Sequence, residues 1–395
     1  MIRSFRYQLK PTKAQERTLL AWLDLTRELY NAALEERKSA WSRQRKSTHI
    51  YDQIRQLPQI RKDRPEFAAV PTTALRGALN LIDNAFSDFF GRCKRGDKPG
   101  YPRFRSAKRW RTLSLSIALP DARHKKPAQL FVAGGSRIAI PVLGKVKLRM
   151  HRPIEGTPKA MQITYDCGRW SIRIGCVDIE PKILPKTGRD IGIDLGINTF
   201  VATSDGEMFA NPRPFRAAEL GLARAARKMH RRKRGSSRRR QAIVLLAKRH
   251  AHIANIRREN HITVANSLIA RNDTIFVEAL TINGLSGGKL AKSVRDVAWG
   301  NFLAWLREKA ENAGRAVVEV DPGYTSQTCP QCDAIAKKSL KQRVHDCPCG
   351  FVGDRDVVAA QVILKLGRSL QGAAAPVRAQ RRSAKIKSVS TTGAS

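Results

Sequence analysis

The sequence predicts a multidomain α+β protein, in which a small β-barrel with an inserted helical module precedes an α/β domain. Three observations support this fold class. Apolar residues recur at helical spacing between residues 12 and 93, and at every second position in short runs after residue 113. Beyond a linker at residues 181–188, strands alternate with long helices. Four cysteines gather between Cys329 and Cys349, within that second part.

Charge restricts the class of partner. The chain has 395 residues, of which 74 are Lys or Arg and 33 are Asp or Glu, so its formal net charge is +41. This surplus calls for a polyanion to offset self-repulsion. The longest apolar run, 242–247, is far shorter than the roughly 18 residues of a membrane span. Arg3 and Arg6 lie where a signal peptide would be apolar. We therefore expect no membrane association, a cytoplasmic, nucleoid-associated location, and nucleic acid as the partner.

The first half is predicted to form one strand, two helices and a set of short strands. Residues 2–8 alternate as a strand, Pro11 ends it, and helices are expected at 12–38 and 72–93, followed by a Gly/Pro loop at 94–105. The expected strands that follow are 113–117, 137–140, 146–150, 161–165 and 170–176. Since one strand precedes the helices, the helical module is interpreted as an insertion into a barrel or sandwich.

The second half begins with a three-stranded meander. Its expected strands are 190–196, 199–203 and 207–210. There follow a helical pair over 217–270, a strand at 274–278, a helix at 299–313, a strand at 315–320 and a last helix at 357–366. The remaining segment, 368–395, has no apolar period and is expected to be a disordered basic tail.

The cysteine cluster predicts one structural zinc ion. Cys329 and Cys332 form one pair and Cys347 and Cys349 the other, and four thiolates suit a closed tetrahedral site. The second pair is one residue shorter than the usual spacing, and His345 offers a substitute ligand. An odd total of seven cysteines without a secretion signal argues against a disulfide framework.

Carboxylates at the ends of three elements predict a catalytic metal site. Asp194 and Glu278 end apolar strands, and Asp356 begins the last helix at the head of an apolar stripe. Strand alternation places Asp194 on one face with Asp190 and Gly192. Acids near a buried surface need cationic partners. Three of them in a strongly basic chain favour two-metal phosphodiester chemistry over solvated strand ends.

Two groups of basic residues are predicted to contact nucleic acid. There is no acidic residue between Glu219 and Glu259, where the first group lies at the expected helix break around Gly235. It consists of Arg231, Arg232, Lys233, Arg234, Arg238, Arg239 and Arg240. The second, in which aromatic stacking adds to charge, contains Tyr101, Arg103 and Arg105.

These motifs, in this order, resemble those of the TnpB family of transposon-encoded, RNA-guided endonucleases, which are related to the type V CRISPR effectors. The resemblance rests on Asp190-Ile-Gly-Ile-Asp194-Leu-Gly, Glu278 after Ile-Phe-Val, Thr325-Ser-Gln-Thr-Cys-Pro-Gln-Cys332 and Cys349-Gly-Phe-Val-Gly-Asp354-Arg-Asp356-Val-Val-Ala-Ala360. Lys10-Pro-Thr-Lys-Ala-Gln, Gly100-Tyr-Pro-Arg-Phe and Ala298-Trp-Gly-Asn-Phe extend it over nearly the whole chain.

The resemblance implies a division into family domains. The wedge β-barrel would comprise 1–10 and 106–182, with the helical recognition lobe at 11–105 inserted into it. A RuvC-like nuclease of RNase H fold would comprise 183–322 and 351–367 and carry a zinc ribbon at 323–350.

The resemblance also implies an activity. Asp194, Glu278 and Asp356 would be catalytic and hold two Mg²⁺ ions, with one Zn²⁺ in the ribbon. A monomer in a ribonucleoprotein would use a guide RNA and a short adjacent motif to select double-stranded target DNA.

Departures from the family pattern leave alternatives open. Val358 replaces an Asn and Ala279 an Asp, which predicts an intact triad with a higher Mg²⁺ requirement. The main alternative is an RNA-guided, repressor-like DNA-binding protein with weak or no cleavage. A DDE-type transposase would end its acid order on Glu, whereas this chain ends on Asp356. A zinc-ribbon rRNA-binding protein would not explain the three acids.

Overall fold

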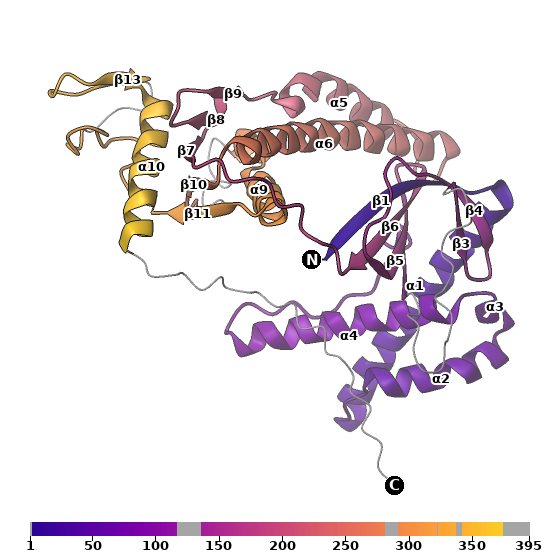
Figure 1. The fold of residues 1–395 in the computed structure, drawn as a ribbon. Helices are drawn as coiled ribbons and strands as arrows, with labels where there is room; N and C mark the ends of the chain where they lie inside the picture. Colours follow the sequence, from indigo (N-terminus) through magenta and orange to yellow (C-terminus); the bar gives the residue numbers. More distant parts are fainter. Residues whose placement is uncertain (1, 117–135, 281–290, 322, 337–341, 374–395) are drawn as a thin grey trace, which may run out of the picture. The chain divides into compact units, whose positions relative to one another are not determined.

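The computed structural model describes residues 2–116, 136–280, 291–321, 323–336 and 342–373. The chain forms two compact units (Figure 1). The first comprises residues 1–181 and 224–251, and the second comprises residues 182–223 and 252–395. Residues 224–251, which the sequence prediction placed in the nuclease domain, therefore group with the first unit.

The first unit contains a six-stranded antiparallel sheet in the order β2-β5-β6-β1-β4-β3. Its strands are β1 (Arg3–Lys10), β2 (Thr112–Ser116), β3 (Arg137–Ile140), β4 (Gly144–Arg149), β5 (Thr157–Asp166) and β6 (Arg169–Val177). Within the described residues β2 and β3 remain its two edges, so the expected barrel is an open sheet. The β3–β4 hairpin joins β1 through three residue pairs between β1 and β4.

Four helices lie between β1 and β2 in the chain, where the sequence predicted an inserted helical module. They are α1 (Lys13–Gln44), α2 (Ile50–Asp63), α3 (Pro65–Ala68) and α4 (Thr72–Lys94). Thr12 and Gln15 form a capping box that starts α1 directly after β1. A Cβ on Gly77 of α4 would lie 2.1 Å from the carbonyl oxygen of Ser114 in β2. The helices and the sheet thus share one hydrophobic core, with Leu19 and Ile163 in the same buried cluster.

Two long helices belong to both units. These are α5 (Pro214–His230) and α6 (Ser237–Arg271), and the break between them falls where Gly235 was expected to cause it. Gly235 has a φ of 85°, which favours glycine. The Ser236 hydroxyl accepts a hydrogen bond from the backbone N–H of Arg239 and caps α6.

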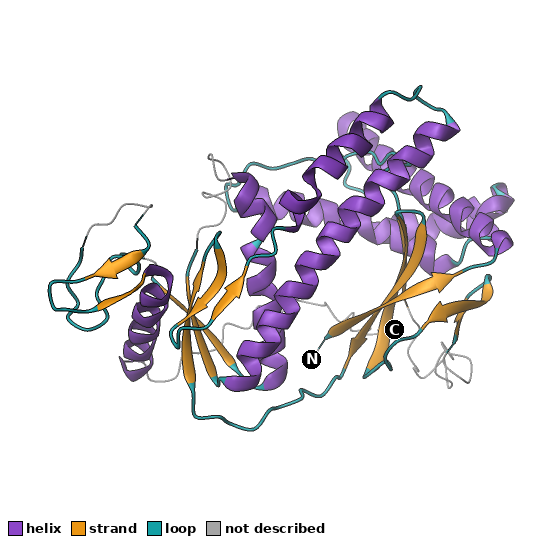
Figure 2. Ribbon diagram, turned by 90° about the horizontal axis from the view of Figure 1, so that it is seen from above, coloured by secondary structure: helices purple, strands orange, loops and turns teal. Residues whose placement is uncertain are grey.

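The second unit contains a five-stranded mixed sheet in the order β11-β10-β7-β8-β9. Its strands are β7 (Asp190–Leu195), β8 (Thr199–Thr203), β9 (Met208–Ala210), β10 (Thr274–Glu278) and β11 (Ala316–Val320). The predicted meander is the antiparallel β7-β8-β9, and β10 runs parallel to both β7 and β11. Helices cover both faces, as the strands between helices in Figure 2 show.

The described residues of this unit also form the helices α8 (Ala291–Val297), α9 (Trp299–Ala313) and α10 (Arg355–Ala373). One sheet face packs on α6 and α9, in a cluster that includes Ile193, Leu268 and Phe302. The other face packs on α10, where Phe276 meets Ile363 (Figure 1).

The last helix is longer than predicted, because Gly367 does not end it. A Cβ at Gly367 would lie 2.1 Å from the ring of Phe276, so this glycine permits close packing of α10 on the sheet. Gly367 therefore continues the buried stripe, whereas Leu366, which was expected on it, is 38% exposed. Of the predicted basic tail, 374–395 lies outside the described residues.

Among the helices described, none combines the length and apolarity needed to cross a membrane.

Candidate active site and four-cysteine cluster

Two of the three predicted acids lie at the carboxyl ends of adjacent parallel strands. In the β10–β7 pair, Thr274 is opposite Asp190 and Val277 is opposite Ile193. The same register carried one residue further places Glu278 beside Asp194. The side chains at both positions are half-buried.

The third acid reaches the same sheet edge because α10 runs antiparallel to β7. Arg368 pairs with Asp190 at 3.7 Å, and a Cβ on Gly192 would lie 2.1 Å from the carbonyl oxygen of Ala360. Continuing along both elements, Asp356 in the first turn of α10 comes level with Asp194. The structure thus confirms that Asp190, Gly192 and Asp194 share one face, and that this face is the one under α10.

Asp354 caps the start of α10. Its carboxylate accepts hydrogen bonds from the backbone N–H groups of Asp356 at 2.9 Å and Val357 at 3.3 Å. This cap holds the first turn of α10 in place, and with it the backbone of Asp356.

Burial dominates the electrostatics of the three acids, and repulsion by the other two adds to it at Asp194. Burial raises the pKa of Asp194 to about 7, and the charges of Glu278 and Asp356 add to the rise. Burial also raises the pKa of Glu278, against a hydrogen bond from Thr325 that lowers it. For Asp356 burial raises the pKa, and the nearby Arg343 opposes the rise. A divalent cation would relieve the repulsion at Asp194, so the three carboxylates are candidate metal ligands. Among the described residues, however, the four cysteines are the group whose ligand atoms already lie within 4.8 Å of one another.

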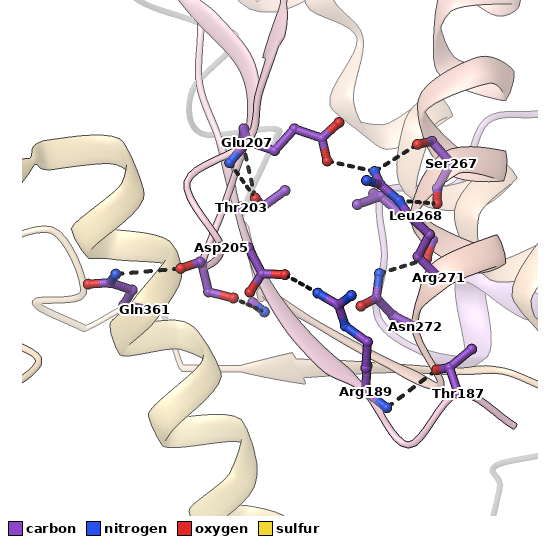
Figure 3. A network of polar contacts seen from close by, with 12 residues as sticks. Thr187, Arg189, Thr203, Asp205, Glu207, Ser267, Leu268, Arg271, Asn272 and Gln361 are labelled. Carbon is purple, nitrogen blue, oxygen red and sulfur yellow. Dashed lines mark hydrogen bonds and ion pairs between the residues drawn. The ribbon is translucent and has the colours of Figure 1, made fainter.

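Other acids of this sheet are neutralised by arginines. Near the start of β7, Arg189 pairs with Asp205 at 2.7 Å, and Arg271 of α6 pairs with Glu207 at 2.6 Å (Figure 3). In the same network Gln361 of α10 donates to the backbone oxygen of Ser204. These contacts pair each acid with a cation or hold the network together. Asp194 differs, because burial and the charges of two other carboxylates are the main influences on its pKa.

Two residues that contact the acids were not predicted. The hydroxyl of Thr325 donates a hydrogen bond to Oε1 of Glu278, and Arg343 lies 3.6 Å from Oδ1 of Asp356. Thr325 belongs to the Thr-Ser-Gln-Thr-Cys motif, so a signal for it was present in the sequence. Arg343 carried no signal beyond its charge.

The four cysteines form one compact cluster. The Sγ atoms of Cys329 and Cys349 lie 3.7 Å apart, those of Cys332 and Cys347 lie 3.5 Å apart, and all four lie within 4.8 Å of one another. Zn–S bonds of about 2.3 Å in a tetrahedron would separate the sulfur atoms by about 3.8 Å. The two close sulfur pairs match this separation, so the cluster fits a zinc ion.

The short second pair still reaches this geometry. It lies in the hairpin of β12 (Val344–Asp346) and β13 (Val352–Asp354). The backbone N–H of Gly350 donates to the oxygen of Cys347 at 2.8 Å, with Gly350 at a φ of 89°. The ring of His345 is fully buried and packs edge-on against Phe351, and the cluster consists of the four thiols.

Comparison with known proteins identifies the family. A relative from Streptomyces pristinaespiralis, named "Putative RNA-guided DNA endonuclease", is 31% identical over 392 residues, which cover 97% of this chain and 94% of that protein. The chain belongs to the TnpB family. InsQ of Escherichia coli (strain K12), another TnpB-family relative named a putative RNA-guided DNA endonuclease, is 24% identical and covers 93% of both chains.

Family models match three segments of this TnpB-family chain. Residues 175–288 match OrfB_IS605, described as "Probable transposase", and residues 299–363 match the Cas12f1-like TNB domain. Residues 1–46 match a helix-turn-helix domain, although here they form β1 and the single helix α1. Among solved structures, the mini-RNA-guided endonuclease Cas_phi3 covers 93% of this chain and is itself covered to 92%, at 10% identity and a TM-score of 0.49.

The first predicted basic group divides into a cavity lining and a structural residue. An open cavity of about 540 Å³ is lined by Arg231 and Arg232 together with three cations of α5 that were not predicted, Arg224, Arg227 and Lys228. Arg239 is half-buried and donates to the backbone oxygens of Met229 and Arg232, so it closes the turn between the helices. Lys233, Arg234, Arg238 and Arg240 are exposed.

The second predicted group forms an exposed aromatic surface. Tyr101 is 45% exposed and packs edge-on against Phe86 and Phe89 of α4. Arg103 is exposed. The side chain of Asn31 fixes the backbone of Arg105, because it accepts a hydrogen bond from the N–H of Arg105 and donates one to its backbone oxygen.

Val358, which departs from the TnpB pattern, is a packing residue. It is 1% exposed, and a Cβ added to Gly353 of β13 would lie 2.9 Å from its Cγ2. The side chain is thus directed to the cysteine-bearing hairpin. This placement favours a packing role over the metal-supporting role considered for the Asn of the family pattern.

Proposed function

We propose that this member of the TnpB family is a Mg²⁺-dependent, RNA-guided DNA endonuclease. The observation that supports this most strongly is the convergence of Asp194, Glu278 and Asp356 at one sheet edge, with the pKa of Asp194 raised to about 7. Such a buried, self-repelling set of acids is typical of a catalytic metal site. The names of the curated relatives support the same activity.

The three carboxylates would hold two Mg²⁺ ions. Bound there, the ions would polarise the attacking water and stabilise the leaving 3′ oxygen. Asp194 would lose its carboxyl proton when the site is loaded, since its pKa of about 7 reflects the charges of the metal-free state. Glu278 is held by Thr325, and the capped first turn of α10 orients Asp356.

The rest of the chain is assigned by the same proposal. The second unit's sheet, with an antiparallel meander beside two parallel strands, would be the RuvC-like nuclease of RNase H fold. The sheet of the first unit would be the wedge domain and α1–α4 the recognition lobe. The four cysteines would hold one Zn²⁺.

A guide RNA and double-stranded target DNA are the proposed partners. The charge of +41 and the cation-lined cavity between Arg224 and Arg232 support phosphate binding. The exposed ring of Tyr101, beside Arg103, supports base stacking. The complex is proposed to contain one copy of the chain, which the mass of the purified ribonucleoprotein would check.

The deciding experiment begins with the RNA that copurifies with the full chain. Sequencing it identifies the guide, and a DNA library carrying the matching target next to randomised flanks then reveals the adjacent motif. We expect double-strand cleavage that requires Mg²⁺ and the matching guide. Guide-dependent DNA binding without cleavage at any Mg²⁺ concentration would instead establish the repressor-like alternative.

A further inference from the structure

The segments that lead into the two cysteine pairs also contact the acids of the candidate active site. We propose that the four-cysteine cluster positions the catalytic carboxylates, with Thr325 and Arg343 as the positioning residues that transmit its geometry to Glu278 and Asp356. This inference rests on the proposed function, because it assigns these two residues a role toward the metal-binding acids.

Thr325 forms the first contact. It precedes Cys329 by four positions and is 3% exposed, and its hydroxyl donates to Glu278. A tight turn fixes it, in which the N–H groups of Gln327 and Thr328 donate to the oxygen of Tyr324 at 2.8 and 3.0 Å. A Glu side chain at a strand end has several rotamers, so a buried donor in a rigid turn selects one of them.

Arg343 forms the second contact from the other cysteine pair. It precedes Cys347 by four positions, and its guanidinium lies 3.6 Å from Asp356. Its backbone oxygen accepts from the N–H of Arg355 at 2.8 Å, so it is joined to the start of α10 as well.

The two segments are joined to each other in two places. A nitrogen of Arg355 donates to the hydroxyl of Ser326 at 3.4 Å, next to Thr325 in the chain. The close sulfur pairs are Cys329 with Cys349 and Cys332 with Cys347, so each joins one cysteine pair to the other. A metal ion at these thiols would therefore fix the separation of Thr325 and Arg343, and through them the carboxylates they contact.

The test compares two substitutions at Thr325 in the full-length chain as isolated. Thr325→Val removes the hydroxyl at nearly the same volume, and Thr325→Ser keeps it. Mn²⁺ binding, followed by electron paramagnetic resonance, is expected to weaken by about 10–100-fold in Thr325→Val and by less than about threefold in Thr325→Ser. Thr328→Val is the matched control, since within the described residues its hydroxyl donates to the backbone oxygen of Tyr324 in the same turn and not to a candidate metal ligand. Its Mn²⁺ affinity should be unchanged.

A double-substitution cycle separates positioning from general stability. Cys332→Ser alone should weaken Mn²⁺ binding, and adding it to Thr325→Val should weaken binding little further, because both break the same connection. Mn²⁺ affinity in Thr325→Val equal to that of the wild type would overturn the inference, as would fully additive losses. If the wild-type protein bound no Mn²⁺ at all, the proposed function itself would fail and this inference with it. Thermal unfolding of each variant identifies any that does not fold. In that case the comparison of Thr325→Val with Thr325→Ser tests the inference without the cycle.

Discussion

The second unit contains two groups of potential metal ligands that are assembled in opposite ways. The four thiols come from two short turns and already lie within 4.8 Å of one another. The three carboxylates come from β7, β10 and α10, and burial and their shared charge raise the pKa of Asp194 to about 7. The first group is shaped by local turns, whereas the second depends on the packing of a whole sheet and helix.

The way in which each group is assembled indicates which kind of metal ion it is suited to bind. A thiol cluster with tetrahedral spacing around its centre suits a permanent metal ion. Carboxylates held near one another by a rigid scaffold, at an unfavourable electrostatic energy, suit ions that are exchanged during a reaction.

Removing any one of the three carboxylates should nearly abolish cleavage. Alanine at Asp194, Glu278 or Asp356 removes several kcal/mol of transition-state stabilisation, which is about a thousandfold or more in rate. Target binding should persist, and both are measured with guide-loaded protein. Asp190→Asn is the matched control on the same strand and face, where the carboxylate pairs with Arg368. Near-normal cleavage by one alanine variant would remove that residue from the site.

Breaking the thiol cluster should cost stability. Cys332→Ser should reduce zinc from about one ion per chain to a small fraction and destabilise the folded state by about 4 kcal/mol. Metal analysis and calorimetric unfolding check this. Cys93→Ser is the control, since Cys93 is an exposed free thiol outside the cluster. A zinc-free wild-type protein with unchanged unfolding would contradict the assignment.

Ionisation of Asp194 should make the folded, Mg²⁺-free protein less stable as the pH rises. In the folded state Asp194 keeps its proton up to about pH 7, whereas in the unfolded chain it loses the proton near its ordinary pKa of 3.8. Its contribution to stability is therefore full below about pH 4 and is lost as the pH rises to 7. Asp194→Asn cannot ionise, so at pH 8 it should be more stable than wild type by up to about 4 kcal/mol.

This gain should disappear at pH 4 and shrink when Mg²⁺ is added. The free energy of unfolding is measured by denaturant titration at both pH values, with zinc retained. A gain that is equal at pH 4 and pH 8 would show that titration of Asp194 is not its cause.

Val358→Asn tests whether position 358, between the cysteine-bearing hairpin and the candidate acids, affects stability or the Mg²⁺ requirement. Its amide would be buried against Gly353, so we expect a loss of about 1–3 kcal/mol in the free energy of unfolding. The Mg²⁺ concentration for half-maximal cleavage should stay the same. Val357→Asn, one residue away and half-buried, is the control. Improved cleavage at low Mg²⁺ would instead restore a metal-supporting role for position 358.

Most helices and strands could be predicted from local patterns, because their formation depends on residues nearby in the sequence. Helix α9, the meander and the helix break at Gly235 follow directly from apolar spacing and turn residues. α2 was missed because Pro58 and many charges interrupt its apolar spacing, although Leu57 is buried. The last helix was predicted to end at 366, because the packing of Gly367 depends on Phe276, far away in the chain.

The candidate site shows the same limit. Asp194, Glu278 and Asp356 could be predicted since each ends or begins an apolar element. The Thr325–Glu278 hydrogen bond could not, because 47 residues separate its partners and the contact exists only once β10 and the cysteine segment are folded. Arg239 looked like a phosphate ligand by charge, but its geometry makes it a turn residue.

The course of α5 and α6 matters for anyone who wishes to shorten this protein. Because residues 224–251 return to the first unit, no single cut in the chain separates the two units. Excising either one would sever both helices, including the 35-residue α6, about 52 Å long. A miniaturised version therefore cannot come from dissecting the chain into halves, and the insertion between β1 and β2 can lose only parts that lie outside the core it shares with the sheet.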